Sequence, residues 1–145
     1  MPTASGENQQ ASSPLRAFGT ATLTVILCIA GWIVGYLVSF VSSVTLFVLS
    51  HMRADQPAKP LTVLGVTVYC IVFGILGGAI GTQFRRRQAK VIGALFVLTN
   101  LAFAAWSWYH SPSTAHWTQF IAIFAISPAG LFGAYISRPH PAPAQ

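Results

Sequence analysis

Four long runs of apolar residues, separated by short polar segments, dominate the chain. Each run is close to or above the roughly 20 residues that a helix needs to cross a hydrocarbon core of about 30 Å. No acidic or basic side chain lies inside any of them. The pattern predicts an all-α integral membrane protein, an up-down bundle of four transmembrane helices at about 17–50, 61–82, 91–109 and 117–137.

The connections between the runs are short, at about 51–60, 83–90 and 110–116. Connections of this length favour sequential helices that lie antiparallel and adjacent. The polar N-terminal segment 1–16 and the Pro-rich tail 138–145 carry too little apolar surface to order themselves, so we expect both to be disordered. The transmembrane domain is therefore expected to cover 17–137.

The first run is longer than one crossing requires. About 34 helical residues at 1.5 Å each would span about 51 Å. The excess must tilt, bend or project. We expect it to extend beyond the bilayer on the outer side, or to bend near Ser42 and Ser43. The run is also too long for the apolar core of a signal peptide, so the first helix is expected to be retained.

The basic residues indicate which way the helices run. With four crossings, both termini and the middle connection share one side, which holds Arg16, Arg85, Arg86, Arg87, Lys90 and Arg138. The opposite side holds only Arg53 and Lys59. This bias predicts cytoplasmic termini in a plasma membrane of the bacterial inner-membrane type. The aromatic residues Trp106, Trp108, Tyr109 and Trp117 bracket the third connection, as expected for an outer interfacial belt.

Only 7% of the residues are charged, far fewer than in soluble domains. The net charge of +6 comes from basic residues at the ends of the apolar runs, so nucleic acid is not an expected partner. The basic cluster of Arg85, Arg86, Arg87 and Lys90 either fixes the orientation by contacting anionic lipid headgroups or binds a regulatory partner.

Glycines at four-residue spacing predict where helices pack closely. Lipid is as apolar as leucine, so close backbone approach and polar contacts hold membrane helices together. Helix 3 offers only alanines, at 102, 104 and 105. The predicted packing positions with GxxxG-like spacing are Gly31, Gly35, Gly74, Gly77, Gly78, Gly81, Gly130 and Gly133.

Asn100 is the most polar residue at depth, at the centre of the third run. Pro128 lies near the centre of the fourth run, where it frees the carbonyl of Phe124. An unsatisfied polar group is costly in lipid. We therefore expect Asn100 to face helix 4 near Ser127 or the freed carbonyl. Asn100 either joins helices or contacts a ligand beside a kink that can hinge.

Candidate chemistry is sparse. His51, His110 and His116 fall on the outer side and are either ordinary interfacial residues or ligands of a metal or haem. We expect no cofactor. Asp55 is the one carboxylate near a histidine, and no nucleophile with a base is apparent, so an enzyme is not expected. Cys28 and Cys70 both lie in apolar runs, where a contact between them is conceivable.

Three functional classes fit these features. The first is a structural or accessory subunit that packs against a larger membrane complex, with other membrane subunits or a second copy as partners alongside the lipid bilayer. The second is a small oligomeric channel or transporter that lacks a buried charged coupling residue. The third is an immunity or stress protein. The uncharged runs and the glycines favour the first.

Overall fold

The computed structural model describes residues 14–53, 56–111 and 115–138, and within them the chain is helical without strands. The elements are α1 (Pro14–Leu49), α2 (Pro60–Gln83), the 3₁₀ turn η1 (Arg86–Gln88) and α3 (Ala89–His110). A fourth helix consists of three consecutive pieces, α4 (Trp117–Ile121), the π-helical turn η2 (Ala122–Ile126) and α5 (Ser127–Ile136). Four helices are long and apolar enough to cross a membrane.

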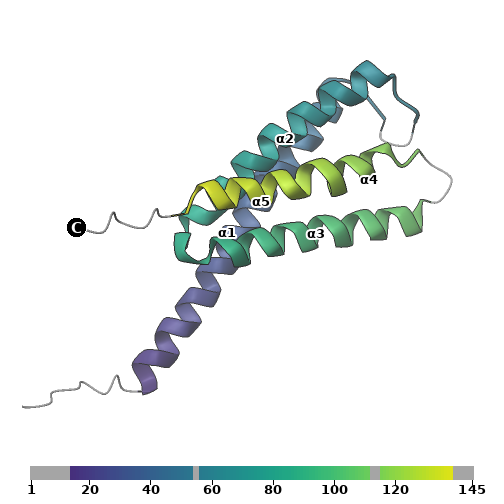
Figure 1. Cartoon of the computed structure of the whole chain (residues 1–145). Helices are drawn as coiled ribbons and strands as arrows, with labels where there is room; N and C mark the ends of the chain where they lie inside the picture. Colours follow the sequence, from purple (N-terminus) through teal and green to yellow (C-terminus); the bar gives the residue numbers. More distant parts are fainter. Residues whose placement is uncertain (1–13, 54–55, 112–114, 139–145) are drawn as a thin grey trace, which may run out of the picture.

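The helices alternate in direction, as the short connections predicted (Figure 1). Figure 1 shows the beginning of α1, the turn between α2 and α3 and the end of α5 at one end of the molecule. The connections from α1 to α2 and from α3 to α4 lie at the other end. The first end carries the basic cluster, and we call it the basic end.

The element boundaries follow the sequence with small shifts. Helix α1 begins at Pro14, so the prediction of a disordered segment to residue 16 is wrong for its last residues. Proline suits the first turn of a helix because its missing N–H would have no partner there. At the other end of α1, His51 has a φ of 51°, the left-handed conformation that often terminates a helix. Residues 1–13 and 139–145 lie outside the described ones.

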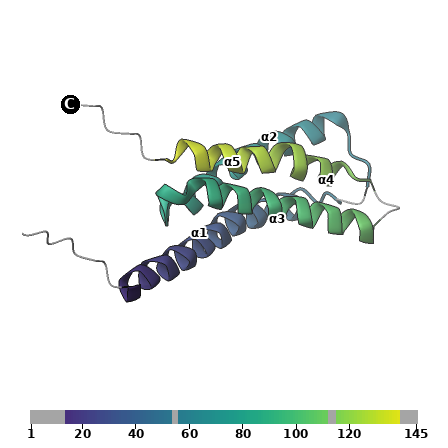
Figure 2. The same cartoon turned by 60° about the horizontal axis from the view of Figure 1, so that its bottom comes forward.

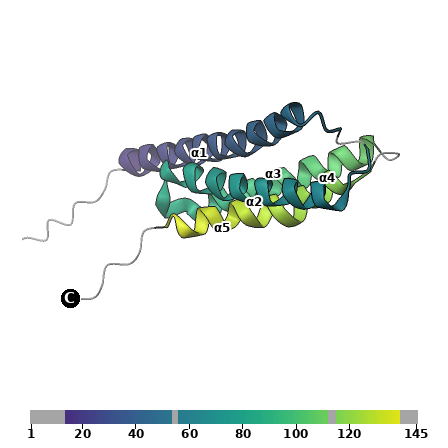
Figure 3. The ribbon, with the colours of Figure 1, turned by 90° about the horizontal axis from the view of Figure 1, so that it is seen from above.

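Not every pair of helices that is consecutive in sequence is also adjacent in the bundle. Helix α2 packs against α1 on one side and α5 on the other, and α3 packs mainly against α5. The prediction that α2 and α3 would be adjacent is wrong, because few residues join them. Figure 3 shows α1 on one side and the other helices grouped below it. The order around the bundle is therefore α1, α2, fourth helix, α3.

Glycines occupy the closest approach of α1 and α2. A Cβ on Gly81 would lie 2.6 Å from the carbonyl oxygen of Gly31, which leaves no room for a side chain. Gly35 faces Gly77 in the same way. Ser39 continues this line and donates a 3.0 Å hydrogen bond to the carbonyl of Phe73. The two helices therefore touch backbone to backbone along this face.

The opposite face of α2 contacts the fourth helix with equal closeness. A Cβ on Gly78 would lie 2.9 Å from the backbone nitrogen of Ala134 and would overlap the carbonyl of Gly130. Gly133 faces the backbone of Ile75, and Gly74 faces Ala129. The glycines singled out in the sequence thus lie at helix contacts. That their spacing drives assembly stays a prediction.

Helix α3 uses a glycine that the sequence reading overlooked. A Cβ on Gly93 would lie 2.8 Å from Cδ1 of Leu131. Phe96, only 2% exposed, places its ring directly over Gly130. Of the three alanines predicted to smooth α3, Ala104 is buried, whereas Ala102 and Ala105 are exposed.

The long first helix is not interrupted at Ser42 and Ser43, and its excess length lies at the basic end. The two serines donate back to the carbonyls of Val38 and Ser39, and the α-helix continues through them. Figure 2 shows the N-terminal part of α1 projecting past the other helices. The expected overhang on the opposite side is therefore wrong: Leu46 and Phe47, near the end of α1, pack together with Val63 of α2 against the buried cluster that contains Val66.

Candidate functional site

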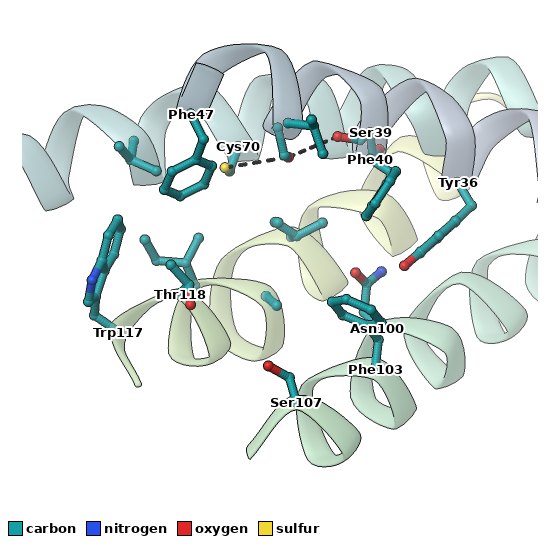
Figure 4. Close-up of a pocket in the computed structure, with 16 residues that line it drawn as sticks. Tyr36, Ser39, Phe40, Phe47, Cys70, Asn100, Phe103, Ser107, Trp117 and Thr118 are labelled. Atoms are coloured by element: carbon teal, nitrogen blue, oxygen red, sulfur yellow. Dashed lines mark hydrogen bonds between the residues drawn. The ribbon is translucent and has the colours of Figure 1, made fainter. Parts of the chain in front are cut away.

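A cavity of about 350 Å³ lies between all four helices, on the side away from the basic end. We call it the central cavity (Figure 4). Its volume falls at the lower end of the range for small-molecule sites. It arises because α1 contacts α2 closely but α3 only weakly, so the inner faces of α1 and the fourth helix do not meet there.

Aromatic and aliphatic side chains form most of the cavity wall. Phe47 and Trp117 meet at its outer end with ring centroids 5.8 Å apart. Trp117 is fixed there by a 3.0 Å hydrogen bond from its indole N–H to the carbonyl of Gln56. The other lining residues are Tyr36, Ser39, Phe40, Ser43, Val44, Val66, Cys70, Asn100, Phe103, Ser107, Thr118, Ile121, Ala122 and Ile126. None of them is ionisable in the pH range where carboxylates and histidines titrate.

Most hydroxyl groups at the wall already have partners within the protein. Ser39 and Ser43 donate to backbone carbonyls, and Ser43 also lies 3.9 Å from the Cys70 sulfur (Figure 4). Ser107 accepts a 3.0 Å hydrogen bond from the Gln119 amide, whose oxygen accepts one from Thr118. Ser39 thereby joins α1 to α2, and Ser107 joins α3 to α4. The donor hydrogens of Ser39, Ser43 and Thr118 are used within the protein, so these hydroxyls can only accept from a ligand.

Tyr36 and Asn100 differ from these residues because each has a polar atom that forms no hydrogen bond within the described chain. Figure 4 shows the Tyr36 hydroxyl and the Asn100 amide near one another at the end of the cavity closer to the basic end, with the amide nitrogen on the Tyr36 side and the amide oxygen on the other. The Asn100 amide donates one 2.9 Å hydrogen bond to the carbonyl of Phe96, which identifies its nitrogen and leaves its oxygen as a free acceptor. Within the described chain, neither the amide oxygen nor the Tyr36 hydroxyl has a hydrogen-bond partner.

The predicted bond from Asn100 to helix 4 is wrong. Asn100 is buried, with 7% exposed, but it satisfies its amide nitrogen on its own helix at the residue four positions earlier. The π turn explains what happens to helix 4 instead. Ser127 directs both its backbone N–H and its hydroxyl to the carbonyl of Ala122, the latter at 2.8 Å. Ser127 is therefore occupied and does not reach across.

We expect Asn100→Leu to leave the fold intact. Asn100 joins no two helices through a hydrogen bond, so the free energy of unfolding should change by less than about 1 kcal/mol. Titration of the purified protein with a denaturing detergent, followed by circular dichroism, measures this change. A loss of several kcal/mol would contradict the contact pattern and restore the role of Asn100 as the group that joins the helices.

The π turn shapes one wall of the cavity. Pro128 has no N–H to donate, and its ring would clash with the carbonyl four residues earlier in a regular α-helix. Widening the preceding turn relieves that clash, and π turns of this kind occur often at functional sites. Ala122 and Ile126, at the two ends of η2, both line the cavity. The structure therefore has a π turn immediately before Pro128, and the predicted hinge beside Pro128 stays a prediction.

Phe40 and Phe103 bound the cavity between α1 and α3. Phe40 and Phe103 come from these two helices, and their rings meet edge to face with centroids 6.4 Å apart. Both rings also remain accessible at the outer surface, with 42% and 48% exposed. Toward the basic end the bundle is closed, because Thr82, Ile92 and Phe96 are almost completely buried.

The histidines do not come together. His110 contacts the carbonyl of Trp106 through Nδ1 at 2.9 Å, and His116 stacks on Trp108 with centroids 4.0 Å apart. His51 is exposed at the end of α1. Within residues 14–53, 56–111 and 115–138, no three His, Cys, Asp or Glu side chains are grouped closely enough to hold a metal. Asp55 lies outside the described residues, and the absence of catalysis stays a prediction.

The two cysteines are far apart. Cys70 lies beside Ser43, whereas Cys28 lies fifteen residues earlier on the same helix as Ser43, a rise of about 22 Å. A contact between them is therefore excluded. Both are buried free thiols.

The basic cluster divides into one inward residue and three outward ones. Arg85 is half-buried and donates a 2.9 Å hydrogen bond to the hydroxyl of Thr24 on α1. Arg86 pairs with the Gln83 amide, and Arg87 and Lys90 are exposed. Arg85 therefore fixes the turn against α1, a contact not foreseen from the sequence, while Arg86, Arg87 and Lys90 are exposed. Their contact with lipid headgroups stays a prediction.

Compared with protein-family models, curated proteins and solved structures, the chain matches none. Function must therefore be argued from the site itself. The sequence reading singled out Asn100 but missed Tyr36, Phe40, Phe103 and Ala122. These residues looked like ordinary lipid-facing or packing positions, and only the angle between the helices turns them toward one space.

Proposed function

We propose that this chain is a multi-pass protein of a bacterial-type plasma membrane, with both termini in the cytoplasm, that serves as an accessory subunit of a larger membrane complex. The four apolar helices and the grouping of basic residues at one end support the location. The observation that carries the accessory role is the unaccompanied N-terminal part of α1.

This part, residues 18–27, is here called the α1 extension. Thr24 accepts a hydrogen bond from Arg85, and close helix packing with α2 begins at Gly31. The large apolar side chains before that point are exposed, with Phe18 at 74%. The extension therefore offers its apolar surface to something outside the chain.

The α1 extension exists because α1 is longer than a single membrane crossing requires. Its 36 residues would span about 54 Å, against about 30 Å of hydrocarbon. Tilting keeps more of the helix in lipid but separates it further from its own bundle. A helix in lipid gains from contact where small residues let backbones approach. Gly19 and Ala21 supply such positions, and nothing lies within 4 Å of a Cβ built on Gly19.

The partner that fits is an apolar transmembrane helix of another subunit. The extension holds no ionised side chain that would select a charged partner, and Thr22 and Thr24 donate to carbonyls of their own helix. The competing class, a channel, has weaker support. The closed packing around Ile92 and Phe96 gives no path through one copy.

A photo-crosslinking residue at Leu23 tests this proposal in living cells. We expect a single adduct with one membrane protein, identified by mass spectrometry and recovered at a fixed ratio. The matched control is Leu98, an equally exposed position on α3, which should crosslink only to lipid. Gly19→Leu should leave the bundle stable but reduce the Leu23 adduct several-fold.

Two results would overturn the accessory role. If Leu23 and Leu98 gave the same diffuse lipid adducts, the extension would have no partner. If Leu23 crosslinked to a second copy of the chain, the oligomeric alternative would replace the proposal.

A further inference from the structure

The central cavity contains two polar groups that the fold itself does not use. The Asn100 amide nitrogen donates to the carbonyl of Phe96, and among the described residues its oxygen has no hydrogen-bond donor. The Tyr36 hydroxyl can donate and accept, and it too has no partner within the described residues. Both residues line the cavity, and neither atom is fully buried, so a ligand that enters the cavity can pair with them.

The two groups define what such a partner must carry. An amide oxygen requires a donor, and a phenol hydroxyl can supply a donor in return. A hydroxyl group placed between them donates to Asn100 and accepts from Tyr36, so that both are satisfied by one atom. Figure 4 shows these side chains meeting at the inner end of the cavity, with the aromatic wall extending away from them.

The rest of the cavity defines the body of the ligand. No acidic, basic or histidine side chain lines it, so a charged molecule would lose its hydration without compensation. Phe40, Phe47, Phe103 and Trp117 supply flat apolar surfaces, which suit a ring through stacked or edge-to-face contacts. The volume of about 350 Å³ admits a small molecule but not a helix.

We propose that the central cavity binds a neutral, ring-bearing alcohol or phenol, whose hydroxyl lies between Tyr36 and Asn100 and whose ring lies among the four aromatic residues. The ligand enters from the bilayer between α1 and α3, where the partly exposed rings of Phe40 and Phe103 separate to admit it. The site is independent of the α1 extension, so it can be tested with the purified chain alone.

The test uses two probes of nearly equal shape, 2-naphthol and 2-methylnaphthalene, which differ in the presence of a hydroxyl. Binding to the full chain in lipid nanodiscs is measured by equilibrium dialysis, with empty nanodiscs subtracted. We expect saturable binding of 2-naphthol. Tyr36→Phe should weaken it about fivefold, as the loss of one hydrogen bond implies, and should leave binding of 2-methylnaphthalene unchanged.

Matched variants separate the cavity from the rest of the surface. Tyr109→Phe removes a hydroxyl from the most exposed tyrosine, 82% accessible and outside the cavity, and should change neither probe. Ala122→Leu fills the cavity and should abolish binding of both probes, whereas Ala102→Leu on the exposed face of α3 should not. Asn100→Leu provides a second removal of the hydroxyl partner and should act as Tyr36→Phe does.

Three outcomes would overturn the proposal. If Tyr36→Phe changed the affinity for both probes by the same factor, the cavity would only accommodate apolar chains such as lipid tails. Unchanged binding in folded Ala122→Leu would place the probes elsewhere. Absence of saturable 2-naphthol binding to the unmodified chain would remove the site.

Discussion

Replacing Gly78 by leucine is expected to abolish the folded bundle. The Cβ of any residue at this position would overlap the carbonyl of Gly130 and lie 2.9 Å from the nitrogen of Ala134, and both atoms belong to backbone that cannot rotate away. The fourth helix would have to separate from α2. Since α3 packs mainly against the fourth helix, α3 would separate from α2 as well. Overpacking typically costs about 1–3 kcal/mol, and a clash with backbone that cannot move lies at or above the top of that range.

The matched control lies on the same helix. Gly65 is exposed and nothing lies within 4 Å of a Cβ built there, so Gly65→Leu should leave the bundle intact or stabilise it slightly through helix propensity. The measurement is the denaturing-detergent midpoint of both variants beside the unmodified chain. Equal midpoints for the two leucine variants would show that α2 and the fourth helix do not approach each other as described.

The sequence was sufficient to predict the helices and their alternation because both depend on local properties. Uncharged runs of sufficient length, ended by polar connections, leave the backbone few alternatives in lipid. The glycines were informative for a similar reason. A position such as Gly81 has no side chain to offer, so it is useful only where another backbone comes near.

The order of the helices and the presence of the cavity depend on how the helices pack against one another, which cannot be deduced from any one apolar run. Whether α2 packs beside α3 or diagonally across from it follows from how tightly the glycine faces on its two sides are matched. Tyr36 and Phe103 are remote in sequence and become neighbours only through that order. Both residues lie among apolar neighbours in the sequence, and nothing in those neighbours distinguishes a cavity wall from a lipid-facing surface.

The polarity of Asn100 alone led to the wrong prediction of a hydrogen bond to the fourth helix. Asn100 at depth must pair with something, but the nearest acceptor is the carbonyl of Phe96 on its own helix, which requires no second element. The overhang of α1 was misplaced for a related reason. The serines in its second half suggested an exposed end, whereas they satisfy themselves within the helix.

Membrane topology is the central claim, and cysteine labelling tests it most directly. In a chain with Cys28 and Cys70 replaced by alanine, single cysteines are placed at Gln56 and Gln83, both exposed and at opposite ends of the bundle. A membrane-impermeant maleimide is added to intact bacterial spheroplasts and, separately, to lysed ones. The positive-inside bias predicts which end stays inside.

We expect Gln56→Cys to be labelled in intact spheroplasts and Gln83→Cys to be labelled only after lysis, with an all-or-none difference between them. Labelling of Gln83→Cys in intact spheroplasts would place the basic end outside, and equal labelling of both positions would contradict an odd number of crossings between them.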